Sequence, residues 1–403
     1  MTEPKTDDAQ AVESPATIAP SVEAPQKEAS NPPELLEAEE QLPYPNEPGE
    51  LTPFVPIVVP ILLELGTDLN SLVNMDTEQG KQFQTELLPL MRQGLFYDLG
   101  VRFPLVRIRI RPEWTNKHFQ ISLYGTPVLS GELLENHTLV GISPKHINSQ
   151  TLKPIPAVHP ITRRLVSWIP DRQLESFKSM NTPTWSPSEF LLLALTSALR
   201  SHAYEFMGIQ ETKAMLELLR PAFPDLVDEC LKAITLPMLR RILRLLVREQ
   251  FSICNLRQIL EIIIDASEYM ESASELANAV RRKMRRHLTH RHANGNQLIV
   301  YLIEKELEGM LENILKDKPL PDDKVLSISK KQSILQGFYH SLQKNISRVP
   351  DKASTPVILT QCSLRSALHR AMRLDFPGIV VLSFNEIDPR YQIRPIATLS
   401  SND

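Results

Sequence analysis

Three histidines near residue 290 have a spacing that could hold a metal ion. His287, His290 and His292 lie within one short basic segment, and neutral imidazole is a common metal ligand. Five cations occupy the same segment: Arg282, Lys283, Arg285, Arg286 and Arg291. Because their positive charge opposes a metal ion, the segment is better explained as the solvated basic end of a helix. We therefore predict no metal site, and without aromatic platforms the segment does not predict a nucleic-acid site either.

Cys254 could act as a nucleophile because it lies near a predicted helix start, where a thiolate is favoured. Its apolar neighbours favour a small buried core residue instead. With Cys230 and Cys362 it forms neither a disulfide framework nor a metal-binding spacing, which is typical of a reducing cytoplasm. The chain also lacks a glycine-rich phosphate loop and the Gly-x-Ser-x-Gly and His-Glu-x-x-His motifs. We expect no enzyme and no cofactor, with a thiol- or hydrolase-type activity as the alternative.

Charge is distributed unevenly along the chain. Residues 1–50 contain nine prolines and twelve Asp or Glu against two Lys, a net charge of −10. Such a segment buries too little apolar surface to fold, so we expect an acidic, disordered tail. Because the whole chain carries −4, residues 51–403 carry +6, which is too weak and diffuse to indicate nucleic acid. No apolar run reaches about 18 residues, so no membrane-spanning segment is expected.

Apolar patterns divide the rest of the chain into strands and helices. Strands are expected at 57–63 and 105–111, with a helix over 77–96 between them. In the second strand apolar residues alternate with arginines, which predicts one buried face and one arginine face. A turn at 125–127 predicts a hairpin over 119–133.

Helices are expected to dominate from 187 to 288. The clearest lies at 236–248, where leucines recur on one side and Arg240, Arg244 and Arg248 line up on the other. The Pro-rich residues 141–185 predict irregular structure with short strands at most. A final α/β unit is expected, with strands at 297–302 and 379–384 and helices at 331–344 and 363–373.

Four segments, in chain order, resemble the cytosolic domain of the type III secretion export-gate family, which has flagellar and injectisome branches. They are residues 97–109, 199–211, 245–261 and 355–387. The second reads Arg200-Ser201-His202-Ala203-Tyr204-Glu205-Phe206-Met207-Gly208, and the last contains Phe376-Pro377-Gly378-Ile379-Val380-Val381-Leu382-Ser383-Phe384-Asn385-Glu386-Ile387. The turn His292-Ala293-Asn294-Gly295-Asn296-Gln297 resembles the injectisome branch more than the flagellar one. We therefore favour the injectisome branch.

The resemblance implies an α/β and α+β fold of several subdomains after the disordered tail. Two α/β subdomains are expected, one inserted in the other, followed by a helical subdomain and a C-terminal α/β subdomain. The expected bounds are 51–125 completed by 186–207 for the first, 126–185 for the inserted one, 208–290 for the helical one and 291–403 for the last.

The resemblance also implies a non-enzymatic docking domain. Such domains form a ring, expected to have nine subunits, at the cytoplasmic face of the bacterial inner membrane. They receive chaperone–effector complexes and gatekeeper proteins, contact other export-apparatus components, and pass substrates to the channel. The family's transmembrane helices are missing from this sequence, so membrane attachment would come only from a missing or separate part. The alternative is a stand-alone soluble adaptor that binds secretion chaperones without forming the ring.

Two sets of site residues follow from the resemblance. The candidate cleft for substrates and chaperones consists of His159, Pro160, Ile161, Arg163 and Glu189. The candidate ring contacts are Arg240, Arg244, Arg248, Arg282 and Arg285, for which a simply solvated face is the alternative. Flagellar members carry asp-pro-x-phe-gly where this chain has His159-Pro160-Ile161-Thr162-Arg163, which indicates a different set of cargo.

Overall fold

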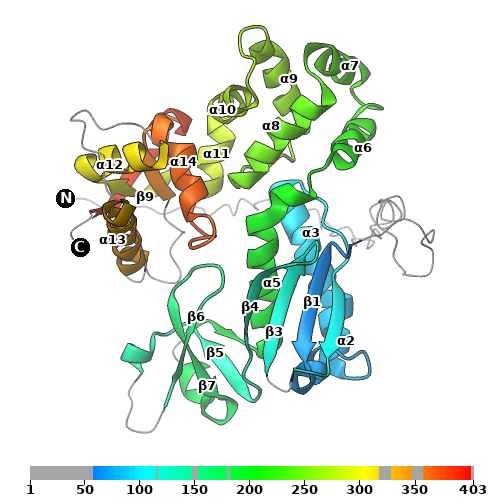
Figure 1. Cartoon of the computed structure of the whole chain (residues 1–403), viewed down its shortest axis with the longest axis vertical. Helices are drawn as coiled ribbons and strands as arrows, with labels where there is room; N and C mark the ends of the chain where they lie inside the picture. Colours follow the sequence, from blue (N-terminus) through cyan, green and yellow to red (C-terminus); the bar gives the residue numbers. More distant parts are fainter. Residues whose placement is uncertain are drawn as a thin grey trace, which may run out of the picture. The chain divides into compact units, whose positions relative to one another are not determined.

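The computed structural model describes residues 58–114, 117–147, 153–178, 182–316, 328–346 and 357–400. All of these belong to one compact unit, Val55–Asp403 (Figure 1). The predicted acidic tail at 1–50 and the start of the strand predicted at 57–63 lie outside the described residues. No helix in the described part combines the length and the apolarity needed to cross a bilayer.

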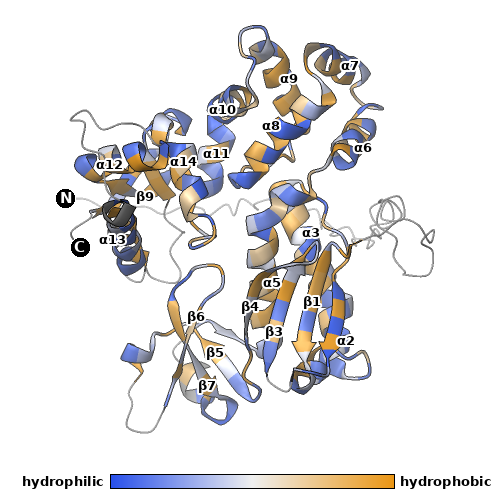
Figure 2. Cartoon of the chain, in the orientation of Figure 1, coloured by the Kyte–Doolittle hydropathy of each residue, from blue (hydrophilic) through white to orange (hydrophobic). Residues whose placement is uncertain are grey.

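The first sheet has the strand order β2-β1-β3-β4. Its strands are β1 (Ile61–Gly66), β2 (Arg107–Arg111), β3 (His118–Leu123) and β4 (Thr126–Glu132). β1 pairs with β2 in parallel and with β3 antiparallel, and β3 and β4 form the predicted hairpin. The mainly hydrophobic β1 carries the core residues Ile61, Leu63 and Leu65, all fully buried (Figure 2). Because β2 lies at the edge, its isoleucines are only half-buried, so the predicted alternation is weaker than expected.

Two helical stretches pack against this sheet, one from residues 78–99 and one from residues 187–202. The predicted helix at 77–96 is present as α2 (Glu78–Gln82), the π-turn Phe83–Leu87 and α3 (Leu88–Leu99), after the 3₁₀ turn Thr67–Leu72. It ends at Gly100, whose φ of 79° suits glycine, since a side chain disfavours this left-handed backbone. The other helix is α5 (Pro187–His202), which starts with a capping box of Ser186 and Glu189.

A second sheet occupies the Pro-rich region and has the order β6-β7-β5-β8. Its antiparallel strands are β5 (His137–Val140), β6 (Ile155–Val158), β7 (Leu165–Pro170) and β8 (Thr184–Trp185). The short helix α4 (Glu175–Lys178) lies between β7 and β8 in the chain. The strands are as short as predicted, but they form a regular sheet. The boundary predicted between 125 and 126 falls inside the β3–β4 hairpin, so we propose that the inserted segment begins after Glu132.

Residues 209–292, called the helical segment below, form six α-helices. These are α6 (Ile209–Leu219), α7 (Pro224–Ala233), α8 (Leu236–Arg248), α9 (Leu256–Ser267), α10 (Ala273–Lys283) and α11 (Arg285–His292). The apolar side of α8 is buried as predicted, with Leu239, Leu243 and Leu246 fully inaccessible. A 3₁₀ turn, Ala203–Phe206, connects α5 to this segment.

The third sheet is wholly parallel, in the order β11-β10-β9-β12. Its strands are β9 (Gln297–Ile303), β10 (Val357–Thr360), β11 (Val381–Ser383) and β12 (Gln392–Leu399). The helices are α12 (Lys305–Lys316), α13 (Ile328–Ile346) and α14 (Cys362–Met372), and the turn Phe384–Glu386 follows β11. β9, β11, α13 and α14 were predicted, whereas β10, α12 and β12 were not.

Candidate functional site

A cavity of about 710 Å³ lies beside β4, the last strand of the first sheet. One wall is β4 and the turn before it, and another is the side of α5 that carries Ser197, Ala198 and Ser201. Arg163 and the residues Leu374 and Pro377 complete the lining. The volume is in the range of sites that hold small ligands or short segments of a partner. Since β4 ends the sheet, its outer edge faces this space rather than another strand.

The loop 159–163 is built around His159. Its Nδ1 atom accepts hydrogen bonds from the backbone N–H groups of Ile161 and Thr162, each at 3.2 Å. The imidazole is buried and lies edge-on to Trp185, with ring centres 4.8 Å apart. The Pro160 carbonyl accepts a hydrogen bond of 3.0 Å from the Ser197 hydroxyl of α5. These contacts fix the loop against the helix that lines the cavity.

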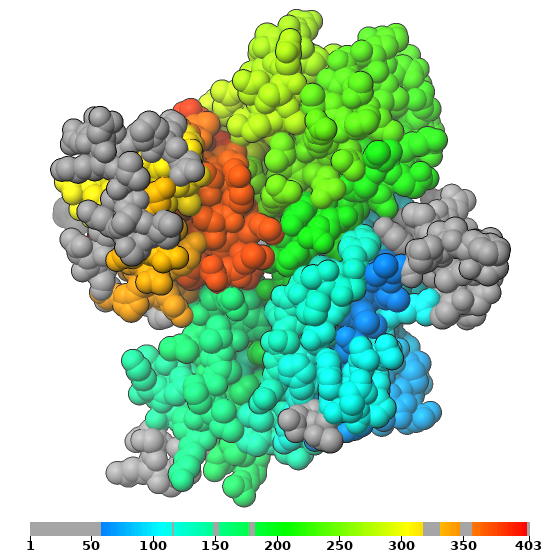
Figure 3. Space-filling view, in the orientation of Figure 1, coloured from blue at the N-terminus to red at the C-terminus, as the bar shows by residue number. Residues whose placement is uncertain are grey.

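Arg163 connects this loop to the segment after α14. Its Nε atom donates to the carbonyl of Asp375 at 2.7 Å, and Nη2 donates to that of Leu374 at 3.5 Å. Arg163 has a left-handed φ of 59°, which costs a non-glycine residue about 1 kcal/mol. Gly378 lies so close to the same loop that an added Cβ would be 2.7 Å from the Ile161 carbonyl oxygen. Figure 3 shows the end of α14 against the inserted segment.

The predicted cleft residues therefore have different roles in the structure. Arg163 lines the cavity, while His159, Pro160 and Ile161 build the loop beside it. Glu189 accepts a hydrogen bond of 2.7 Å from the Ser186 N–H in the capping box of α5, and it is not among the residues that line the cavity.

The predicted arginine stripe on α8 faces Tyr204. The guanidinium carbons of Arg248, Arg373 and Arg244 lie 4.4, 5.1 and 5.6 Å from the centre of its ring, distances typical of cation–π contacts. Burial, together with the charges of Arg240 and Arg248, lowers the pKa of Arg244. Arg244 and Arg248 thus make contacts within the chain. Of the other predicted ring contacts, Arg240 is half-buried, whereas Arg282 and Arg285 are exposed.

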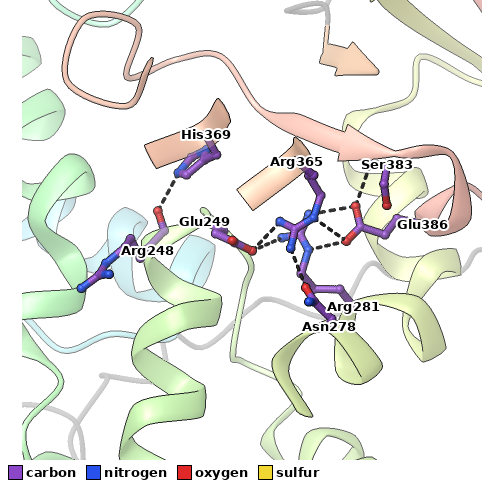
Figure 4. Close-up of polar contacts among 8 residues, drawn as sticks. All are labelled: Arg248, Glu249, Asn278, Arg281, Arg365, His369, Ser383 and Glu386. Carbon is purple, nitrogen blue, oxygen red and sulfur yellow. Dashed lines mark hydrogen bonds and ion pairs between the residues drawn. The ribbon is translucent and has the colours of Figure 1, made fainter. Parts of the chain in front are cut away.

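A buried network of charges joins the helical segment to the third sheet (Figure 4). Arg281 of α10 donates to Glu386 at 2.6 Å, and Arg365 of α14 donates to Glu249 and to Asn278. Burial alone would raise the pKa of Glu249, but the charges of Arg281 and Arg365 outweigh it and hold the pKa at about 2. Glu386 is likewise buried, and Arg281 keeps its pKa below the ordinary value. No local pattern predicts this network, because its paired residues are 105 and 116 positions apart.

The histidines and Cys254 do not form a reactive group. His290 is exposed and bonds the Tyr391 hydroxyl at 2.9 Å, while burial and Arg291 lower the pKa of His292 to about 4. Within the described ranges, no group of three or more His, Cys, Asp or Glu could hold a metal ion. The prediction that Cys254 is buried is wrong: the residue is exposed in the turn before α9, where its Sγ atom donates to the Phe96 and Tyr97 carbonyls.

Known proteins resemble this chain in both sequence and structure. The model of the FHIPEP family matches residues 10–392. "Low calcium response locus protein D" of Yersinia pestis is 25% identical over 333 residues, which are 81% of this chain and 47% of that protein. The chain thus spans about half the length of this curated relative.

Two solved structures extend the comparison. The Chlamydia pneumoniae CdsV protein, in a complex described as CdsV and CdsO, has a TM-score of 0.71 at 27% identity, covering 86% of this chain and 99% of CdsV. Nonameric EPEC SctV-C has a TM-score of 0.62 at 21% identity, covering 86% and 99% of the two chains. The latter likeness concerns the fold alone.

Proposed function

Because this chain belongs to the FHIPEP family, we propose that it is the cytosolic docking domain of a type III secretion export gate. In this proposal it acts at the cytoplasmic face of the bacterial inner membrane and performs no catalysis. It binds chaperone–effector complexes and gatekeeper proteins and passes substrates to the channel. The observation that carries the proposal is the cavity of about 710 Å³ between the free edge of β4 and α5.

The lining of this cavity suits an extended segment of a partner. An edge strand offers unpaired backbone groups, to which another chain can add as a further strand. Opposite β4, the small side chains of Ser197, Ala198 and Ser201 leave room for such a segment. Access depends on the Arg163 loop, since Arg163, Leu374 and Pro377 close one side of the cavity. Movement of this loop away from 374–378 would open the cavity.

Substitutions on β4 test the docking role. Ser130 lines the cavity and is exposed, so Ser130→Trp should fill the cavity without disturbing the core. Glu132→Trp is the matched control, because Glu132 lies two residues further along β4, is also exposed and does not line the cavity. We expect Ser130→Trp to weaken binding of a purified chaperone–effector complex at least about tenfold, measured by calorimetry. Equal binding by both variants would place docking elsewhere.

We further propose that copies of the chain associate into a ring. The description of a neighbour as nonameric supports a ring of nine, and the CdsV–CdsO complex supports contacts with other secretion components. Of the proposed contact residues, Arg282 and Arg285 have the exposure that a subunit contact requires, whereas Arg240, Arg244 and Arg248 are half-buried. Sedimentation velocity over a wide concentration range tests association. A strict monomer would instead favour the soluble adaptor.

A further inference from the structure

Away from α10, most exposed charges in the described helical segment pair with one another. Ion pairs join Lys213 to Glu217 at 3.5 Å, Arg220 to Asp228 at 2.5 Å and Arg257 to Glu261 at 3.0 Å. A further pair joins Lys232 to Glu229 at 2.7 Å. Helix surfaces with such pairs are balanced locally and need no external partner.

Helix α10 departs from this pattern at both of its ends. At its N-terminal end lies an acidic pole of four exposed carboxylates: Asp265, Glu268, Glu271 and Glu275. At its C-terminal end lies a basic pole of four exposed cations: Arg282, Lys283, Arg285 and Arg286. None of these eight side chains forms an ion pair with another described residue. The acidic pole also presents Tyr269, whose surface is 66% exposed.

The two poles cannot pair within one molecule. α10 has eleven residues, so at 1.5 Å per residue about 16 Å of helix separate them. The helix is held in place by its packing against α8 and α9 and by the buried Arg281, which binds Glu386. Two unlike, complementary patches on one rigid element are suited to a head-to-tail contact, in which each copy uses one patch on each neighbour.

We propose that the acidic pole of one copy docks on the basic pole of the next, an inference that rests on the proposed ring. Arginine forms strong two-point hydrogen bonds with carboxylates, and a guanidinium can stack on the exposed ring of Tyr269. The helix dipole favours acids in the first turn and bases in the last turn of α10. It accounts for Glu275 and Arg282, but Asp265 and Glu268 precede the helix, and Arg285 and Arg286 begin the next one.

Charge reversal in the full chain tests this contact. One variant carries Arg282→Glu with Arg285→Glu, another Glu268→Arg with Glu271→Arg, and a third carries all four changes. Self-association is measured by sedimentation velocity at low salt, where charge contacts are strongest. Each reversal places like charges opposite each other and should weaken association at least about tenfold. The fourfold variant restores opposite charges and should recover association to within about threefold of the unmodified chain.

The control is Lys213→Glu with Lys232→Glu, which makes the same change of charge elsewhere in the helical segment and should leave association unchanged. Thermal unfolding of every variant shows that a loss of association does not reflect unfolding. If the unmodified chain associates but the reversals have no effect, or if the fourfold variant fails to recover, the pole-to-pole contact is wrong and the ring remains. If the unmodified chain stays monomeric at all concentrations, the ring itself is wrong, and this contact with it.

Discussion

His369 shows how burial sets the charge of a single side chain. Its imidazole lies on α14 and is buried, and its Nε2 atom donates to the Arg248 carbonyl at 2.8 Å. Burial lowers its pKa to about 4, although Glu249 and the hydrogen bond to the Arg248 carbonyl favour the charged form. The charges of Arg281 and Arg365 lower it further. The folded protein therefore keeps His369 neutral at a pH where the unfolded chain would protonate it.

The pH dependence of stability follows from this depressed pKa. Between the ordinary value of 6.5 and about 4, the unfolded chain binds a proton that the folded chain excludes. The free energy of unfolding should therefore fall as the pH drops from 6.5 to 4, by up to about 1.4 kcal/mol per pH unit for this histidine. His369→Gln keeps a donor for the Arg248 carbonyl but cannot titrate. We expect this variant to lose the contribution of one proton to the slope of the free energy of unfolding against pH. The slope can be measured by urea unfolding across this range.

The control for this experiment is His340→Gln, since His340 is exposed on α13. It should leave the slope as it is in the unmodified chain. His292 has a pKa lowered to about 4 by burial and by Arg291, so part of the slope should persist in the His369 variant. An identical slope in both variants would mean that His369 is already protonated, or solvated, in the folded chain.

At the scale of elements, the contact between the 159–163 loop and the segment after α14 depends on a glycine. A Cβ on Gly378 would lie 2.7 Å from the Ile161 carbonyl oxygen, closer than nonbonded atoms approach. We expect Gly378→Ala to push the loop away and to lower the free energy of unfolding by about 1–3 kcal/mol. Hydrogen exchange of the β6 and β7 amides should become faster, since these strands flank the loop. Both quantities can be measured on the full chain.

Gly309→Ala is the matched control for this substitution. Gly309 lies in α12, and a Cβ there would meet no atom within 4 Å. Alanine restricts the unfolded chain and favours the helix, so this variant should gain about 0.5–1 kcal/mol. Its β6 and β7 amides should exchange as in the unmodified chain. If these amides exchange in Gly378→Ala as slowly as in the unmodified chain, the loop accommodates the added methyl group without moving.

Elements with a clear apolar period could be predicted from the sequence. α8 and α14 bury one side each, and the β3–β4 hairpin follows from its turn. β10 was missed because its four residues, all buried, show no alternation, and β12 because most of its residues are exposed at an edge. Of the candidate cleft, only the loop 159–163 could be predicted, and only through the resemblance to the export-gate family. Its contact with Leu374 and Asp375 joins residues more than 200 positions apart, which no local pattern reports.

In the molecule as a whole, two of the junctions between segments differ in their chemistry. The inserted segment meets the residues after α14 through hydrogen bonds from one half-buried side chain, Arg163, to main-chain carbonyls. The helical segment meets the third sheet through the network of Glu249, Arg281, Arg365 and Glu386, all nearly inaccessible to solvent. Buried charges without partners are costly, so the second junction resists separation. The first junction is the one that can open while the rest of the chain stays folded.

Glu386→Gln tests the strength of the second junction. It removes one of two carboxylates that neutralise Arg281 and Arg365, leaving excess positive charge in a buried site. Removing one partner of such a network lowers the free energy of unfolding by about 3–5 kcal/mol. The control is Glu261→Gln, at an exposed pair with Arg257, which should lower it by less than about 1 kcal/mol. Because the loss falls on one junction, we expect hydrogen exchange of the β9 and β10 amides to become faster while the β1 and β3 amides keep their protection.

Arg163→Ala removes the hydrogen bonds of the first junction and should have the converse effect, with faster exchange confined to the amides of β6 and β7. Uniformly faster exchange in both variants would mean that the sheets unfold as one cooperative body, in which the docking cavity could not open separately.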